Sequence, residues 1–194
     1  MHILFIVDPI DKQKAGIYHY TLQMVYHIWK MNTKHQLSFI SLNSDQILSQ
    51  IKAIPLPNTI PFIMNDPIRQ LVSLPHLINK IKPDVVVEPA HFGPFNLLKR
   101  IKRITVIHDL TPILFPDLHP LSSQVLHRIF MKRILRKADL IITNSENTKL
   151  DVIKYSKQVA LKTHSVLLGK DKLFRPLKDE SILEKHRIGK PFIL

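Results

Sequence analysis

Short apolar runs alternate with amphipathic segments along the chain, and this alternation predicts its secondary structure. Runs with the length of strands cover residues 2–7, 36–42, 84–89, 103–108, 139–145 and 163–168. Apolar positions recur at helical spacing in residues 16–31, 45–52, 66–81, 120–137 and 146–155. We expect Pro75 to kink or split the helix at 66–81. Strands that alternate with helices predict an α/β fold with a Rossmann-like, doubly wound parallel sheet and helices on both faces.

Polar residues follow several of these strands. His108 and Asp109 lie at the end of the run RITVIH, Glu88 lies at the end of DVVVE, and Ser145 follows DLIITN. Gly16 comes after the first strand. Ligands of doubly wound sheets bind where the carboxyl ends of the strands meet, so these residues predict a ligand site on that edge.

Charge and composition narrow the class of partner. The 28 Lys and Arg residues exceed the 15 acidic residues, which gives a net charge of +13. This excess predicts attraction to a polyanion such as anionic lipid, a nucleotide phosphate or nucleic acid. The sequence has no cysteine, so it can form neither a disulfide nor a thiolate metal site. No apolar run approaches the ~20 residues of a membrane span, so we expect a cytoplasmic protein that is soluble or peripheral at the inner membrane face.

Residues 120–137 combine an apolar stripe with basic residues. The stripe consists of Leu121, Val125 and Ile129, with Leu135 as a further candidate. One interpretation is a peripheral contact with an anionic bilayer, and the other is a solvated basic face with the stripe buried in the core. Nucleic acid would explain the same charge, but the sequence carries no RNA-recognition, zinc-finger or basic-zipper signature. The basic positions are His127, Arg128, Lys132, Arg133, Arg136 and Lys137, with further ones in LLKRIKR at 97–103.

Metal and dinucleotide sites are not expected. The 11 histidines are scattered, and no H-E-x-x-H spacing occurs. The sequence also has no G-x-G-x-x-G motif.

Five segments in order carry a family resemblance. They are AGIYHYTLQMVYHI (15–28), EPAHFGPF (88–95), TVIHDLTPILFPDLHP (105–120), ADLIITNSENTKLDVIKY (138–155) and VLLGKDKLFRP (166–176). Their pattern resembles the N-terminal, acceptor-side domain of glycosyltransferase family 4, the retaining enzymes with a GT-B fold, and most of all its mannosyltransferase-like members. The resemblance implies a UDP- or GDP-sugar as co-substrate, a glycan or lipid-linked acceptor, and no permanently bound cofactor.

The resemblance also implies roles for single residues. His108 would be the catalytic residue, in contact with the donor sugar or the acceptor. Asp109 would either orient the His108 ring or cap the following turn. Gly16 and His19 would face the donor pyrophosphate, where the family usually has a second glycine and an arginine. The alternative is that Gly16 is a simple turn residue. The predicted acceptor-side and substrate-binding residues are Glu88, His91, Asp109 and Ser145, and Ser145 is also a plausible helix cap.

We expect residues 1–176 to form the Rossmann-like domain. Residues 177–194 then resemble a linker helix and the first strand of a nucleotide-sugar-binding C-terminal domain. Because the reaction of the family needs both domains, the chain alone is expected to be inactive, and that domain would act in cis or in trans. The alternative is a non-catalytic basic module that binds anionic membrane lipid or nucleic acid.

Overall fold

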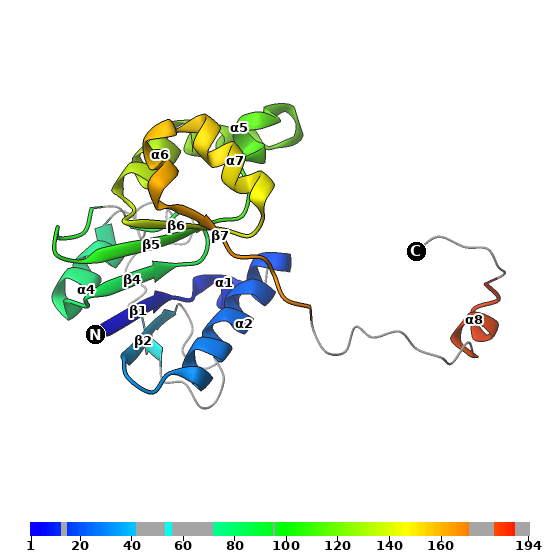
Figure 1. The fold of residues 1–194 in the computed structure, drawn as a ribbon, viewed down its shortest axis with the longest axis horizontal. Helices are drawn as coiled ribbons and strands as arrows, with labels where there is room; N and C mark the ends of the chain where they lie inside the picture. The colour runs from blue at the N-terminus through cyan, green and yellow to red at the C-terminus, as the bar shows by residue number, and fades with distance from the viewer. Residues whose placement is uncertain (13–14, 42–52, 56–71, 95, 171–180, 189–194) are drawn as a thin grey trace.

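The computed structural model describes residues 1–12, 15–41, 53–55, 72–94, 96–170 and 181–188. Within them, seven strands form one parallel sheet (Figure 1). The strands are β1 (His2–Ile6), β2 (Gln36–Ser41), β3 (Ala53–Pro55), β4 (Val85–Glu88), β5 (Lys102–Ile107), β6 (Leu140–Thr143) and β7 (Thr163–Ser165).

The helices connect and cover the strands. α5, α6 and α7 lie together at the upper end of the view in Figure 1, and α2 lies at the lower end. The α-helices are α1 (Asp8–Lys12), α2 (Ala15–Met31), α4 (Leu74–Ile81), α5 (Thr111–Leu114), α6 (Leu121–Lys137), α7 (Glu146–Tyr155) and α8 (Ser181–Lys185), and the 3₁₀ helices are η3 (Pro116–Leu118) and η4 (Lys157–Lys162).

The strand order is β3-β2-β1-β4-β5-β6-β7, and each neighbouring pair is parallel. The chain therefore moves outward from β1 to β3, returns to place β4 beside β1, and then moves outward to β7. The order reverses between β1 and β4, which makes this the switch point where such sheets bind ligands. The predicted Rossmann-like α/β class is confirmed.

Alternate residues of β1 pack on opposite faces of the sheet. Leu4 and Ile6 join a buried cluster with Ile78 of α4. Phe5, the residue between them, joins a second cluster with Val25 of α2. Because helices cover both faces, the consecutive positions Leu4, Phe5 and Ile6 are all buried, which explains the continuous apolar run.

A third buried cluster fills the other half of the sheet. Ile107 of β5 and Ile141 of β6 pack there with Met131 of α6 and Val152 of α7. This packing holds the first turn of α7 close to the carboxyl end of β5, where the hydroxyl of Thr148 donates to the carbonyl of His108.

Several expected boundaries differ from the observed ones. α4 begins at Leu74 with Pro75 in its first turn, directly after the π-helical residues Val72 and Ser73. Proline is tolerated there because the first N–H groups of a helix have no intrahelical partner. That Pro75 kinks or splits the helix expected at 66–81 stays a prediction. The run at 163–168 is a strand only as far as Ser165. The expected helix at 45–52 and residues 66–71 of the expected helix at 66–81 lie outside the described residues.

The inner face of α6 is not the expected stripe. His127, Met131, Ile134 and Leu135 are its buried residues, at the i, i+4, i+7 and i+8 spacing of one helical face. The interpretation that Leu121, Val125 and Ile129 are buried in the core is therefore wrong, because they lie on the opposite side of the helix and are exposed. Among the described residues, no helix has the length and hydropathy to cross a membrane.

Candidate functional site

His108 directly follows β5, at the carboxyl end of the sheet. Its Nε2 atom lies 2.7 Å from the carbonyl oxygen of Pro89, in the loop after β4. A carbonyl oxygen only accepts, so Nε2 carries the proton and donates it. The neutral ring then has its lone pair on Nδ1, which makes no hydrogen bond to another described residue. His108 thus presents an acceptor with a fixed orientation.

His91 holds a strained position beside this ring. Its φ angle is 39°, in the left-handed region that few non-glycine residues adopt. Its amide donates to the carbonyl of Val106 at 3.1 Å, and its Nδ1 lies 3.5 Å from the amide nitrogen of His108. The hydrogen bonds to β5 offset the backbone strain and hold the two imidazole rings 5.8 Å apart.

A third histidine joins these two rings, and we define the histidine cluster as His91, His108 and His127. The His127 ring, from α6, lies 5.8 Å from His91 and 4.6 Å from Phe92. Tyr20, from α2, meets the His108 ring edge-on at 4.9 Å. The sequence analysis counted His127 among the basic positions of the helix and gave Tyr20 no role, but His127 is buried on the inner face of α6. Only the packing of α6 and α2 brings these two side chains to this edge.

The histidine cluster is neutral at physiological pH. Burial, helped by the nearby His108 and His127 and opposed by Asp109, lowers the pKa of His91 to about 4. Burial also lowers the pKa of His108 and of His127. The Nδ1 atom of His127 lies 2.8 Å from the carbonyl of Ser123, so its buried Nε2 carries a lone pair with no partner among the described side chains.

Asp109 caps the turn that follows it. Its Oδ1 accepts hydrogen bonds from the amide of Thr111 at 2.9 Å and from the hydroxyl of Thr111 at 2.5 Å. Burial raises the pKa of Asp109, but these hydrogen bonds outweigh burial, so the pKa is lower than usual. The orientation of the His108 ring is instead set by Pro89. Of the two predicted structural roles, capping is the one that the contacts support.

Glu88 lies beneath the site and is 2% exposed. Its Oε2 accepts from the Thr105 hydroxyl at 2.5 Å and lies 3.6 Å from Nη2 of Arg103, and its Oε1 accepts from the Ala90 amide at 2.9 Å. Burial raises the pKa of Glu88, although Arg103 and these hydrogen bonds oppose the shift. A Cβ on Gly93 would lie 2.1 Å from Cγ of Glu88. This buried carboxylate therefore fixes the loop that carries His91.

Ser145 is the N-cap of α7, as predicted. Its Oγ accepts from the amide of Thr148 at 3.0 Å. The hydroxyl of Thr148 in turn donates to the carbonyl of His108 at 3.1 Å. The cap therefore connects the start of α7 to the backbone of His108, while a substrate contact of Ser145 stays a prediction.

A pocket of about 510 Å³ opens next to the histidine cluster, between α2 and the segment 166–169. Gly16, His19 and Tyr20 line it from α2, and Tyr20 also contacts His108. A Cβ on Gly16 would meet no atom within 4 Å, so this turn borders open space. The pocket thus brings Gly16 and His19 to the same region as His108. Its remaining lining residues are Gln23, Met24, His27, Ile28, Val166, Leu167, Leu168 and Gly169.

The histidine cluster does not have the geometry of a metal site. Among the described residues, no three His, Asp or Glu side chains are placed to hold one ion. The expectation that no metal takes part stays a prediction.

Two solved structures resemble the fold. One is Anabaena Alr3699/HepE in complex with UDP and glucose, with a TM-score of 0.62 and 16% identity over 96% of this chain. The other is the S. aureus MnaA–UDP co-structure, with a TM-score of 0.58 and 13% identity over 96% of this chain. This chain covers 50% and 51% of those chains, so it spans about half their length.

Sequence comparison gives the family. No curated protein matches the chain. The family model described as Glycosyltransferase Family 4 matches residues 20–161, which include the three histidines of the cluster and the start of α7. The match covers well over half of the 194 residues, so the chain belongs to Glycosyltransferase Family 4.

Proposed function

We propose that this chain forms the acceptor-side wall of a retaining glycosyltransferase. The enzyme transfers a sugar from a UDP- or GDP-sugar to a glycan or lipid-linked acceptor. Family membership supports the reaction class, and the UDP bound by the two similar structures supports a nucleotide-sugar donor.

The position of His108 carries the proposal. Its Nε2–H is held by Pro89, and its Nδ1 lone pair is free to accept a hydrogen bond from a sugar hydroxyl. Since burial lowers the pKa of His108, the ring is neutral when it does so. A neutral imidazole of fixed orientation suits a site where positive charge develops on the sugar, because it adds no repulsion.

The pocket between α2 and residues 166–169 is the proposed entrance for the substrates. Gly16 and His19 lie at its edge, where the donor pyrophosphate would approach the first turn of α2. Glu88 takes a positioning role in this proposal in place of the predicted substrate contact, because its carboxylate is buried against Thr105 and Arg103.

We also propose that transfer requires a nucleotide-binding domain in addition to residues 1–176, supplied in cis or in trans. The chain spans about half of each similar structure, which supports a second domain on the other side of the substrate site. An anionic membrane surface is proposed as a partner at the cytoplasmic face, because the net charge is +13.

The test is a transfer assay with UDP- and GDP-sugars, on the chain alone and with a supplied C-terminal domain. Release of the nucleotide and the anomeric configuration of the product are measured. We expect release only when both parts are present, with retained configuration. In the completed enzyme, His108→Ala lowers the rate by about 10²–10³-fold, the range for removal of one preorganised hydrogen-bonding group from an active site.

The matched control is His164→Ala, which removes an exposed histidine of β7. This variant keeps the wild-type rate. Robust turnover by the chain alone contradicts the need for a second domain. An unchanged rate in His108→Ala contradicts the role of His108.

A further inference from the structure

α6 has two faces of opposite character. Its inner face is buried against the sheet and carries His127. Its outer face carries Leu121, Val125 and Ile129, which are 76%, 52% and 61% exposed. Each of these positions lies four residues after the previous one, so the three side chains form one line along the helix. Exposing this line of apolar surface to water costs free energy.

The exposed apolar surface continues over the elements that precede α6. Leu114 ends α5 and Leu118 ends η3, and α5 packs against both η3 and α6. We define the apolar tip as the exposed apolar residues of this region: Leu114, Phe115, Leu118, Leu121, Val125 and Ile129. A group of exposed apolar residues on elements that pack together marks an interaction site more often than single exposed leucines do.

Basic residues continue the same outer face toward the end of α6. Arg128, Lys132 and Arg136 are exposed there, and residues 121–137 contain no acidic residue. Lys132 also lies 5.6 Å over the ring of Tyr155, so the two arginines are the better probes. The outer face therefore begins apolar and ends basic.

We propose that the apolar tip and the basic end of α6 dock on an anionic membrane surface. The apolar side chains enter the interfacial region of the bilayer, and the basic side chains contact the lipid headgroups. Nucleic acid would pair with the basic end but would leave the apolar tip in water. A second copy would bring no acidic residue of α6 to the basic end, so like charges would repel.

The same helix connects this surface to the candidate site. Ile129 is exposed on the outer face of α6, and His127, two residues earlier in the sequence, belongs to the histidine cluster. A docked α6 would hold the site at a fixed height above the bilayer, where it would meet a lipid-linked acceptor. This last step rests on the proposed sugar transfer, whereas the docking itself locates the proposed membrane partner and does not depend on sugar transfer.

The test is co-sedimentation of the chain with phosphatidylcholine vesicles, with and without phosphatidylglycerol, at rising ionic strength. The wild-type chain binds the anionic vesicles, and salt weakens the binding. Ile129→Asp weakens it by more than about tenfold, because it removes an inserted apolar group and adds a repelled charge. Arg128→Gln/Arg136→Gln weakens it by about tenfold or more and reduces its salt dependence.

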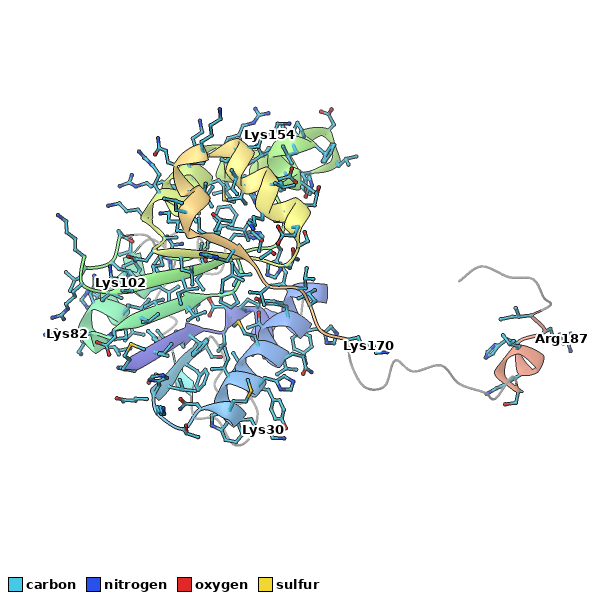
Figure 2. All side chains as sticks on the ribbon, viewed as in Figure 1. Lys30, Lys82, Lys102, Lys154, Lys170 and Arg187 are labelled. Atoms are coloured by element: carbon cyan, nitrogen blue, oxygen red, sulfur yellow. The ribbon has the colours of Figure 1, made fainter. Side chains whose placement is uncertain are left out.

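The matched controls lie at the end of α2, far from α6. Met31 is 70% exposed, and Lys30 lies at the opposite end of the molecule from Lys154 of α7 (Figure 2). Met31→Asp and Lys30→Gln/Lys34→Gln keep binding within about twofold of wild type. Val125→Asp repeats the Ile129 test, and thermal unfolding shows that each variant is folded.

Three results would overturn the docking proposal. The first is vesicle binding that Ile129→Asp and Val125→Asp leave unchanged. The second is a chain that binds duplex DNA but not vesicles, with the DNA binding abolished by these variants. The third is a wild-type chain that is a dimer in light scattering and does not bind vesicles, with the dimer dissociated by the same variants. Sugar transfer is not measured, so a failure of the proposed function leaves this test intact.

Discussion

Two glycines of the site region have opposite surroundings. Gly93 is packed so closely that an added Cβ would overlap the buried side chain of Glu88, whereas Gly16 borders open space. We expect Gly93→Ala to lower the free energy of unfolding by about 1–3 kcal/mol, since Glu88 and its partners must shift. Gly16→Ala should change it by less than about 1 kcal/mol. Urea unfolding measures both, and equal losses would contradict the packing.

The histidine cluster makes stability depend on pH. Burial holds the pKa of His91 at about 4, whereas the unfolded chain has an ordinary value near 6.5. Between these values the unfolded state binds more protons, so the free energy of unfolding falls as the pH falls. We expect a loss on the order of 2–3 kcal/mol across this window from His91. The lowered pKa values of His108 and His127 act in the same direction.

The variant His91→Asn isolates this contribution. Asparagine does not titrate and tolerates the left-handed backbone that His91 adopts. Urea unfolding from about pH 7 to about pH 4 should therefore show a flatter pH dependence than in the wild type. His164→Asn, which removes an exposed histidine, is the control and should keep the wild-type dependence. Parallel curves for wild type and His91→Asn would show that His91 does not titrate as described.

At the scale of elements, α7 was the best predicted part of the chain. The cap at Ser145 and the helix from Glu146 to Tyr155 agree with the structure. A cap acts through local backbone groups, so its signal is contained in a few neighbouring residues. α6 shows the opposite case, since both of its faces carry apolar residues and only packing decides which face is buried.

The cap gives a test at this scale. Ser145→Ala should lower the free energy of unfolding by about 1 kcal/mol, because the amide of Thr148 loses its acceptor. Ser122→Ala, at an exposed position in the first turn of α6, should leave it unchanged. Urea unfolding compares the two, and an equal effect would contradict a specific cap.

At the scale of the molecule, the sheet joins all three buried clusters into one folding unit. Trp29 of α2, the only tryptophan of the sequence, packs against the buried cluster that contains Phe5. Ile141 lies in the cluster on the other half of the sheet. We expect Ile141→Ala to lower the free energy of unfolding by about 2–5 kcal/mol, and Trp29 fluorescence and far-UV circular dichroism to report one coincident transition. Separate transitions would show that the two halves unfold independently.

The sequence by itself determined the fold class and much of one edge of the site. Apolar periodicity is local, so it specified the strands and helices, and the strand ends located Glu88, His108 and Ser145 on one rim. His91 and His108 were predicted from short segments that resemble the family. The misplaced end of the run at 163–168 was an error of a few residues within a correct element.

Only the tertiary structure decided which side chains act together. Tyr20 and His127 reach His108 because α2 and α6 pack on the sheet, and no local pattern encodes that packing. The structure also assigned Glu88 to a buried ion pair and turned Leu121, Val125 and Ile129 outward. The physical reason is that burial and contact depend on residues far apart in the sequence. When both faces of a helix carry apolar residues, only the packing of the whole chain decides which face is buried.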